Sequence, residues 1–424
     1  MELLFARGQM AYSLAFHIIF AAIGIAMPIL MVAAELRGRR SGDPHDLELA
    51  RRWAKGTAVF FAVGAVSGTV LAFELGLLFP RFMEHAGPIV GMPFSLEGIA
   101  FFTEAIFLGL YLYGWDRLRP AVHAACGAVV ALAGIASATF VIIANAWMNA
   151  PAGFRVTGDG ALVDIDPIAA MGTPFAPHEI VHGVLAAVMA TGMAVAAIHA
   201  WALLRAPGAP LHRRALGLAL ALALPAALAQ PVVGHHAGQM VARHQPAKLA
   251  AMEGIEQTEA GVPMRLGPIE IPGLVSWLAT GDAGATLRGL EDLPAADRPP
   301  AGIVGAAHKI MVGLGSAAAA WATITLMLLL RRRRLPDARW WLWSTVLLGP
   351  AGMIAMEAGW TVTEVGRQPW TIHGVLRTED AATTVTGLWL PFTLFALVYL
   401  GLAVVCGIVL VRQVRQTVPP AEAA

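Results

Sequence analysis

Several ionisable side chains lie within long apolar segments of the chain. They are His17, Glu74, Glu97, Glu104, His182, Glu357 and Glu364. An ionisable group at the middle of a bilayer costs at least about 2.5–3.5 kcal/mol on insertion scales, so each is a candidate for a functional role. Histidine is a common ligand of haem iron, and carboxylates can accept and donate protons. These residue types therefore indicate proton or electron transfer within a bundle of apolar helices.

Two pairs of glutamates share one spacing. Glu97 and Glu104 are seven residues apart, and Glu357 and Glu364 repeat that interval. Seven residues make about two turns of α-helix, so the members of each pair face the same side. Paired carboxylates could serve ion transport as well as electron transfer, and the spacing leaves both possibilities open.

A compact polar group follows the second pair. Trp360, Glu364 and Arg367 are spaced i, i+4 and i+7, which aligns an indole, a carboxylate and a guanidinium on one helix face. Gly366 and Pro369 predict that the helix ends there. In a site of low dielectric constant, Glu364 and Arg367 could also stabilise each other as an ion pair without any metal.

The composition indicates the elements that must hold these residues. Of 424 residues, 57% are hydrophobic and only 13% are charged, whereas about a quarter are charged in ordinary soluble domains. With a mean hydropathy of +0.66, the chain is neither a soluble globular nor a disordered protein. A net charge of +1 gives no bulk attraction to nucleic acid. The two cysteines, both in apolar runs, exclude a disulfide framework and c-type haem attachment.

The sequence predicts an all-α integral membrane protein with nine spans. A spanning helix needs about 20 mostly apolar residues. The qualifying segments are near 12–34, 57–79, 94–114, 121–146, 180–204, 215–234, 304–330, 340–361 and 386–411. The first lacks a basic leader and is long enough to span, so we expect a retained helix and no cleaved signal peptide.

Basic residues predict the orientation. Eighteen of the 29 Lys and Arg residues fall on one side of the nine spans. Positive charge marks the cytoplasmic face, which places the N-terminus outside and the C-terminus in the cytoplasm. The chain is then one membrane domain, 1–424, with a long outer loop at 235–303. A loop of this length is usually functional.

Four potential iron ligands are predicted at similar depth near the outer face. They are His17, His182, Met311 and Glu364, each on a different span. A lone histidine in a span is more often an interhelical hydrogen-bonding group, and a methionine is more often core packing. The residues alone therefore allow a redox cofactor without requiring one.

The segment Gly359–Trp370 resembles the GWxxxExGRQPW motif of subunit I of the cytochrome bd quinol oxidases. Other segments match this family in order. They are Phe16–His17, Leu96–Gly98, Phe101–Glu104, Gly114–Leu118, Asn145–Met148, Val181–His182 and Lys248–Glu253. The resemblance covers essentially the whole chain.

The resemblance implies three haems. His182 and Met311 match the ligands of the low-spin haem b, and His17 and Glu364 match the ligands of two high-spin haems. One of the high-spin haems is a haem b, and the other is a haem d or a further b-type haem. Which of His17 and Glu364 holds which haem stays open. His/Met ligation suits electron transfer, whereas a single protein ligand leaves a position for oxygen.

Four further residues are implied around the haems. Arg367, Trp360 and Trp370 would pair with propionates or pack on porphyrin. Lys309 occupies the position, two residues before the methionine, where the family usually has an arginine.

The resemblance also assigns two pairs of proton-handling residues. Lys248 and Glu253 match the quinol-oxidation motif of the outer loop, which is called the Q-loop, and we expect both on a solvated surface. A carboxylate can take a hydroxyl proton while an ammonium steadies the developing anion. Glu97 and Glu104 match an acidic pair that carries protons to the oxygen site.

The chain departs from the commoner family pattern in several places. His235 and His236 stand where many relatives carry an acid, and Glu74 replaces a glutamine. With Lys309 and the short Q-loop, these features resemble the branch called cyanide-insensitive oxidases.

We therefore expect a quinol:oxygen oxidoreductase of the bacterial cytoplasmic membrane. It would oxidise quinol at the outer face, reduce oxygen to water and generate a proton-motive force. The expected partners are a second large subunit (subunit II), with a small single-span subunit as a further possibility, and no nucleic acid. Two alternatives remain, a proton-coupled transporter and an electron-transfer cytochrome that does not reduce oxygen.

Overall fold

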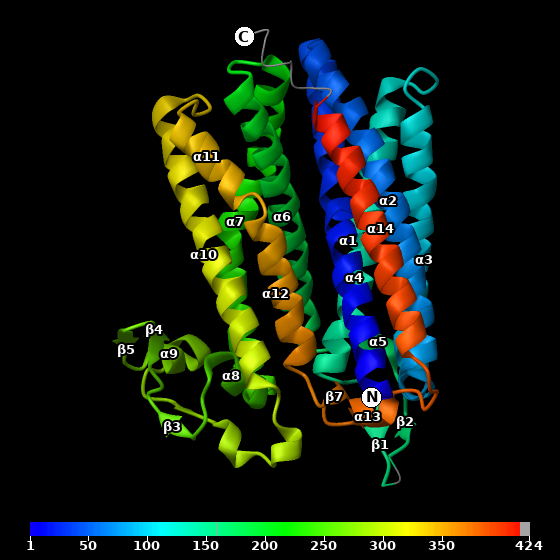
Figure 1. Cartoon of the computed structure of the whole chain (residues 1–424), viewed down its shortest axis with the longest axis vertical. Helices are drawn as coiled ribbons and strands as arrows, with labels where there is room; N and C mark the ends of the chain where they lie inside the picture. Colours follow the sequence, from blue (N-terminus) through cyan, green and yellow to red (C-terminus); the bar gives the residue numbers. More distant parts are fainter. Residues whose placement is uncertain (159, 416–424) are drawn as a thin grey trace.

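Long, nearly parallel helices make up most of the computed structural model, which describes residues 1–158 and 160–415 (Figure 1). Among these residues, eight helices are long and apolar enough to cross a membrane. They are α1 (Glu2–Ser41), α2 (Pro44–Leu78), α3 (Pro80–Tyr113), α4 (Pro120–Asn149), α6 (Ala176–Arg205), α7 (Pro210–His244), α10 (Ala301–Arg332) and α14 (Trp389–Arg415). Five of them carry proline in the first turn. A backbone N–H at that position has no intrahelical partner, so proline loses no hydrogen bond there.

The segment predicted as one span at 340–361 is two helices in the structure. They are α11 (Arg339–Leu348) and α12 (Ala351–Val365), which follow one another along the bundle (Figure 1). Gly349 and Pro350 separate them, because Pro350 has no N–H to continue the bonding pattern. α1 begins at one end of the bundle and α14 ends at the other.

Several boundaries differ from the prediction, because α1, α2 and α3 begin 10, 13 and 14 residues before the predicted spans. α7 continues to His244, ten residues beyond the predicted end of that span at 234. His235 and His236 are therefore helical, and the segment outside the long helices begins at Gln245.

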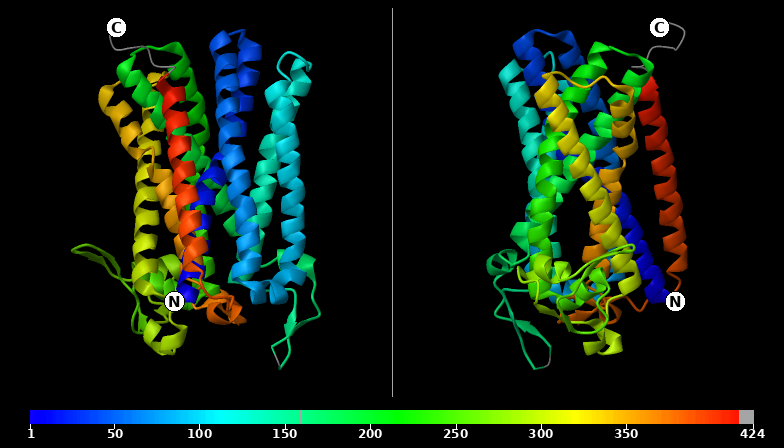
Figure 2. Two further views of the ribbon diagram at one scale, coloured as in Figure 1. Left: turned by 45° about the vertical axis from the view of Figure 1, so that its right-hand side comes forward. Right: turned by 90° about the vertical axis from the view of Figure 1, so that its left-hand side faces the viewer.

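Short elements cover the end of the bundle where α1 begins (Figures 1 and 2). Between α4 and α6 they are β1 (Arg155–Val156), β2 (Leu162–Val163) and α5 (Pro167–Met171). Between α7 and α10 they are α8 (Pro246–Glu253), β3 (Glu259–Ala260), β4 (Met264–Leu266), β5 (Ile269–Ile271), α9 (Leu274–Thr280), β6 (Thr286–Leu287), η1 (Leu290–Asp292) and η2 (Ala295–Asp297). After α12 they are β7 (Trp370–Ile372), β8 (Leu376–Arg377) and α13 (Thr378–Ala381). The strands form antiparallel pairs, β1 with β2, β3 with β6, β4 with β5 and β7 with β8.

Small residues let α6 pack very closely on its neighbours. A Cβ added at Gly192 of α6 would lie 2.9 Å from the Cβ of Ala223 on α7, and one added at Gly352 of α12 would lie 2.6 Å from the Cα of Ala190 on α6. A Cβ at Gly349 would overlap the side chain of Ala197 on α6. Helices at backbone distance gain van der Waals contact without a hydrophobic driving force. α6 is therefore held between α7 on one side and α11 and α12 on the other.

A buried carboxylate joins three helices near the opposite end of the bundle. Glu35 Oε1 on α1 accepts a hydrogen bond from Arg39 Nε at 2.7 Å and lies 2.8 Å from His123 Nδ1 on α4. His123 Nε2 lies 2.9 Å from the carbonyl oxygen of Tyr111 on α3. His123 is thus an interhelical hydrogen-bonding group.

Candidate functional site

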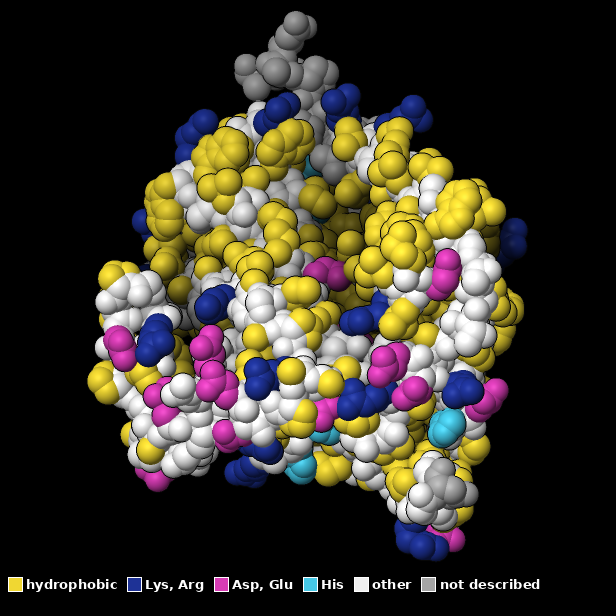
Figure 3. All heavy atoms as spheres, turned by 60° about the horizontal axis from the view of Figure 1, so that its bottom comes forward, with side chains coloured by type: hydrophobic (Ala, Val, Ile, Leu, Met, Phe, Trp, Pro, Cys, Tyr) yellow, Lys and Arg dark blue, Asp and Glu magenta, His cyan; other side chains and the backbone are white. Residues whose placement is uncertain are grey.

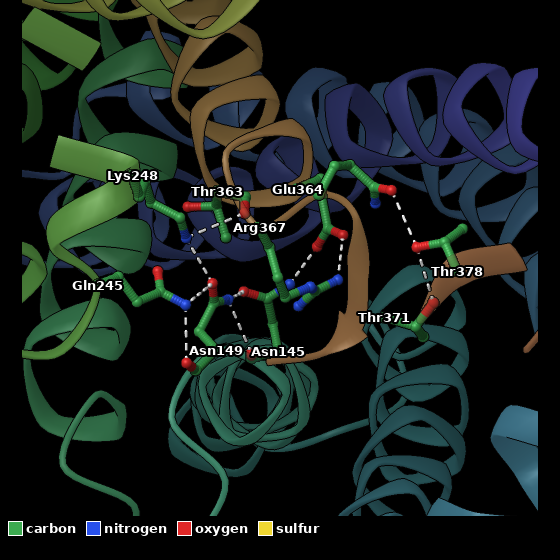
Figure 4. Close-up of polar contacts among 10 residues, drawn as sticks. Asn145, Asn149, Gln245, Lys248, Thr363, Glu364, Arg367, Thr371 and Thr378 are labelled. Atoms are coloured by element: carbon green, nitrogen blue, oxygen red, sulfur yellow. Dashed lines mark hydrogen bonds and ion pairs between the residues drawn. The ribbon is translucent and has the colours of Figure 1, made fainter. Parts of the chain in front are cut away.

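One hydrogen-bond network connects α8 with the end of α12 by way of α4 (Figure 4). Lys248 Nζ donates to Asn149 Oδ1 at 2.5 Å and to the carbonyl oxygen of Thr363 at 3.2 Å. Asn149 Nδ2 donates to Asn145 Oδ1 at 3.0 Å, and Asn145 Nδ2 donates to Glu364 Oε1. The network links the Lys248–Glu253 segment to the Gly359–Trp370 segment, two motifs that are over 100 residues apart in sequence.

Glu364 and Arg367 form an ion pair at the end of this network. Arg367 Nη2 donates to Glu364 Oε2 at 2.6 Å, and Arg367 is only 3% exposed. Its Nε and Nη1 have no hydrogen-bond partner among the described residues. α12 ends at Val365 with Gly366 directly after it, as the sequence predicts. A buried guanidinium with unpaired hydrogen-bond donors is suited to bind an anionic ligand.

Lys248 is buried, so the prediction that it lies on a solvated surface is wrong. It is 3% exposed, because α8 packs against α10 and α12. A Cβ added at Gly366 would lie 2.9 Å from Lys248 Cγ, so only glycine allows this lysine stem to lie against the chain after α12. Burial lowers the pKa of Lys248 to about 7, and the charge of Arg367 acts in the same direction, against those of Glu179 and Glu364.

Glu253, the last residue of α8, is half-buried and faces α10. Its Oε1 lies 3.5 Å from His308 Nδ1, and both side chains are at most one-fifth exposed. Burial raises the pKa of Glu253, and the neighbouring charge of Lys309 opposes that rise. The structure thus pairs one residue of the predicted quinol motif with a histidine that the sequence analysis did not select.

His17 is oriented by α2. Its Nδ1 lies 3.0 Å from Ser67 Oγ, and the Ser67 hydroxyl donates to the carbonyl oxygen of Val63 at 2.9 Å. In this arrangement Ser67 accepts from the Nδ1–H tautomer of His17, in which the lone pair of Nε2 is available to a metal. A Cβ added at Gly68 would lie 2.9 Å from His17 Cε1, so glycine makes room for the ring.

His182 and Met311 also lie against glycines. A Cβ added at Gly234 would lie 3.3 Å from His182 Cε1, and one added at Gly359 would lie 3.0 Å from Met311 Sδ. Gln230 Nε2 donates to the carbonyl oxygen of His182 at 3.1 Å. Met311 on α10 is therefore in contact with α12, and His182 on α6 with α7.

The two tryptophans occupy different surroundings. Trp360 on α12 packs against a cluster that includes Ile18 of α1 and Ala186 of α6. Trp370 in β7 lies under the guanidinium of Arg377, 4.7 Å from the ring centre. Trp360 thus faces the interior between three helices, whereas Trp370 belongs to the outer layer.

The acidic pair of α3 faces α4 and α1. Ser137 Oγ donates to Glu97 Oε1 at 2.9 Å. Glu104 is 6% exposed and lies between two glycines, where added Cβ atoms at Gly24 and Gly134 would be 3.8 and 3.5 Å from its carboxylate. The Glu104 carboxylate therefore lies against the backbone of both α1 and α4.

The two remaining buried acids differ in how they are satisfied. Glu74 Oε1 on α2 accepts hydrogen bonds from Gln9 Nε2 at 2.9 Å and Ser13 Oγ at 3.0 Å, both on α1. Glu357 Oε1 on α12 has no partner among the described residues. Helix pairing therefore accounts for Glu74 Oε1, while Glu74 Oε2, like Glu357 Oε1, has no hydrogen-bond partner among the described residues.

The site residues fit a porphyrin better than a bare metal ion. In the described part of the chain, no group of three or more His, Cys, Asp or Glu converges as a metal-ion site. Haem iron takes four nitrogens from the porphyrin and needs only one or two axial ligands from the protein. The free nitrogens of Arg367 suit propionates, and Figure 3 shows a hollow between the helices lined by hydrophobic side chains.

Several residues of the network were not selected from the sequence. In the sequence analysis Asn145 appears only within a matched segment, and Asn149 and Gln245 do not appear. His308, which lies outside the network beside Glu253, was not selected either. Gln245 Nε2 donates to the carbonyl oxygen of Asn149 at 2.8 Å. The sequence did contain one signal for this network, because Asn145 and Asn149 are spaced i, i+4 at the end of an apolar helix. Amides in a span usually make specific hydrogen bonds.

Comparisons with known proteins agree over the full length of the chain. The family described as cytochrome bd terminal oxidase subunit I matches residues 5–418. A Bacillus subtilis protein provisionally described as a cytochrome bd menaquinol oxidase subunit I is 34% identical, with 95% of each chain covered. The Escherichia coli cytochrome bd-II ubiquinol oxidase subunit 1 is 27% identical, with 93% of this chain and 92% of the relative covered. The structure of the bd oxidase from Geobacillus thermodenitrificans superposes with a TM-score of 0.91, at 36% identity and 98% coverage of both chains.

Proposed function

Because this chain belongs to the cytochrome bd terminal oxidase subunit I family, we propose that it oxidises quinol at the α8 end of the bundle and holds the haems at which oxygen is reduced to water. The chain is a subunit of a bd-type terminal quinol oxidase. The observation that carries the site assignment is the network from Lys248 to Glu364. It connects the quinol motif with a haem-ligand candidate through buried side chains.

Proteins of this family carry haem. The haem types and the residues that hold them in this chain are part of the proposal. His182 and Met311 would hold a low-spin haem b, while His17 and Glu364 would hold a high-spin haem b and a haem d or further b-type haem. The bound haems supply electron transfer and an open iron position for oxygen. The free Nε2 lone pair of His17 and the glycines against His182 and Met311 support this assignment. Arg367, Trp360, Trp370 and Lys309 would contact the propionates and porphyrin faces.

The chain's own residues would handle the quinol protons. Glu253 would accept a proton from a quinol hydroxyl, and Lys248 would stabilise the negative charge left on the quinol oxygen. Asn149 and Thr363 hold the Lys248 ammonium in place through two hydrogen bonds. A lysine whose pKa is near 7 can also exchange its proton during turnover.

Protons for oxygen reduction would reach the site by way of Glu104 and Glu97. Gly24 and Gly134 bring the backbone of α1 and α4 against Glu104, and Ser137 donates a hydrogen bond to Glu97. Uptake from the cytoplasm and release of quinol protons outside would together charge the membrane.

The proposed topology has nine crossings, with α11 and α12 together forming the eighth. The start of α1 and the end of α14 at opposite ends of the bundle support an odd number. Basic residues at the α14 end support an outer N-terminus in a bacterial cytoplasmic membrane. A second large subunit, subunit II, accompanies subunit I in this family, and a small single-span subunit is part of the proposal. Exposed apolar side chains on α14 and α3, such as Leu397 and Phe102, require lipid or such a partner.

The test is a reduced-minus-oxidised spectrum of the purified complex with pyridine haemochrome analysis, which counts b and d haems. We expect His182→Ala and Met311→Leu each to abolish the low-spin b signal while the protein still inserts into the membrane. A full low-spin spectrum in His182→Ala would refute the ligand assignment. Membership of the family does not favour the two alternatives, a transporter or a cytochrome without oxygen reduction.

A further inference from the structure

His308 stands beside Glu253 at the contact of two helices. Its Nδ1 is 3.5 Å from Glu253 Oε1, and the two side chains are 16% and 20% exposed. The distance is short enough for a proton to pass after a small rotation of either side chain. His308 lies three residues before Met311 on α10.

The backbone contact between α8 and α10 fixes this pair. A Cβ added at Gly305 would lie 3.2 Å from the carbonyl oxygen of Ala251 and 3.5 Å from that of Met252. Gly305 is one turn before His308, so the last carbonyls of α8 lie directly against the helix that carries the histidine. His308 also makes a hydrogen bond with the backbone of Met252.

When Glu253 is ionised, two features of the surroundings favour a proton on His308 and two oppose it. The carboxylate is an opposite charge in contact, and the C-terminal end of α8 carries partial negative charge. Burial of the imidazole opposes a proton on His308 most strongly, and the neighbouring charge of Lys309 acts in the same direction. The pair can thus exist as a neutral acid beside a neutral imidazole, or as a carboxylate beside an imidazolium.

We propose that His308 accepts the proton from the Glu253 carboxyl during quinol oxidation and releases it to the outer solvent. This inference rests on the proposed function, in which Glu253 takes the quinol proton. Each quinol loses two protons and two electrons, and a single carboxylate holds one proton at a time. The quinol O–H bond breaks and its proton goes to Glu253. It then moves from the Glu253 carboxyl to His308 Nδ1 and on to water, while the electrons leave by the oxidase's own redox groups.

The test compares the assembled oxidase with His308→Gln, Glu253→Gln and the double variant. The matched control is His235→Gln, at an exposed histidine whose ring stacks on Trp277. If His308 accepts protons, kcat for quinol oxidation falls on the order of tenfold or more in His308→Gln at neutral pH. In His308→Gln, kcat should then rise with pH, because hydroxide and buffer take the proton from Glu253 directly. Retention of the low-spin haem spectrum reports that the variant is folded.

The double variant tells whether the two residues work in series. We expect it to be no slower than Glu253→Gln, because the second residue has nothing to accept once the first is blocked. Multiplicative losses would overturn the proposal, since they indicate independent roles. A wild-type kcat and pH profile in His308→Gln, with Glu253→Gln impaired, would overturn it while leaving the proposed function standing. Unchanged quinol kinetics in Glu253→Gln would overturn the proposed quinol role itself.

A second variant covers the case in which His308→Gln does not assemble. In His308→Ala, added imidazole should restore turnover, whereas pyrazole, a ring of similar size but far weaker basicity, should not. Equal restoration by both rings would show that His308 only fills space, and would refute the proposal.

Discussion

The ammonium of Lys248 and the side-chain oxygen of Asn149 are joined by a 2.5 Å hydrogen bond between α8 and α4. The same asparagine donates to Asn145, which donates to Glu364. Two asparagine side chains therefore connect Lys248 of the proposed quinol motif with Glu364 at the end of α12. The side-chain path to Glu364 depends on Asn149, while Lys248 also donates directly to the carbonyl oxygen of Thr363 on α12.

Asn149→Ala should impair quinol oxidation and weaken the fold. The variant removes the acceptor of a buried ammonium, and such a loss costs about 1–3 kcal/mol, or more for a charged donor. We expect a lower kcat/KM for quinol with all haems retained, and a lower apparent melting temperature. Steady-state kinetics and thermal unfolding measure the two effects. Gln257→Ala, at an exposed amide of the outer layer, is the control, and equal behaviour of the two variants would contradict the prediction.

The stability of the protein should rise with pH above neutrality because of Lys248. Burial lowers its pKa from 10.5 to about 7. Below pH 7 both states bind the proton and the folded state bears the full penalty. Between about 7 and 10.5 the unfolded chain binds more protons, so the free energy of unfolding increases with pH. Thermal unfolding from pH 7 to 10 should give a steeper rise for the wild type than for Lys248→Met, and parallel curves would refute it.

Glu364→Ala and His17→Ala should each remove or perturb one high-spin haem. Each removes a proposed axial ligand, and Glu364→Ala also leaves Arg367 without its 2.6 Å partner. We expect oxygen consumption to be lost in both and carbon monoxide difference spectra to change. Glu379→Ala, an exposed acid of α13, should behave as wild type. Normal carbon monoxide binding in Glu364→Ala would reduce that residue to a structural ion pair.

Glu104→Gln should slow oxygen reduction while leaving the haems in place. A glutamine fits the same space between Gly24 and Gly134 but cannot carry a proton, and loss of a proton carrier typically costs 10²–10⁴-fold. Oxygen consumption with excess quinol measures the effect. Glu84→Gln, an exposed acid on the same helix, is the matched control. Turnover above half of the wild-type rate in Glu104→Gln would exclude the residue as an obligatory carrier.

The membrane class and the end of α12 were predictable from local sequence. Apolar length alone identifies the long helices, and the end of α12 follows from Gly366. The division between α11 and α12 was also encoded locally, by Gly349 and Pro350. It was missed because hydropathy averages over such a break.

The burial of Lys248 and the partners of Glu253 were not predictable in this way. A charged residue in a loop is usually solvated, and only the packing of α8 on α10 and α12 reverses that expectation for Lys248. His308 comes next to Glu253 through a contact between residues 55 positions apart. Such contacts depend on tertiary packing that neither spacing nor composition contains.

The close packing around α6 bears on the speed of electron transfer. Ala190, Gly192 and Ala197 hold this helix at backbone distance from three neighbours, and His182 lies on the same helix. Interiors packed this densely resist displacement. If His182 holds the low-spin haem as proposed, the backbone around it can shift little when an electron arrives. The reorganisation energy is then small, so small residues far from any redox group would help to set the rate at which electrons pass.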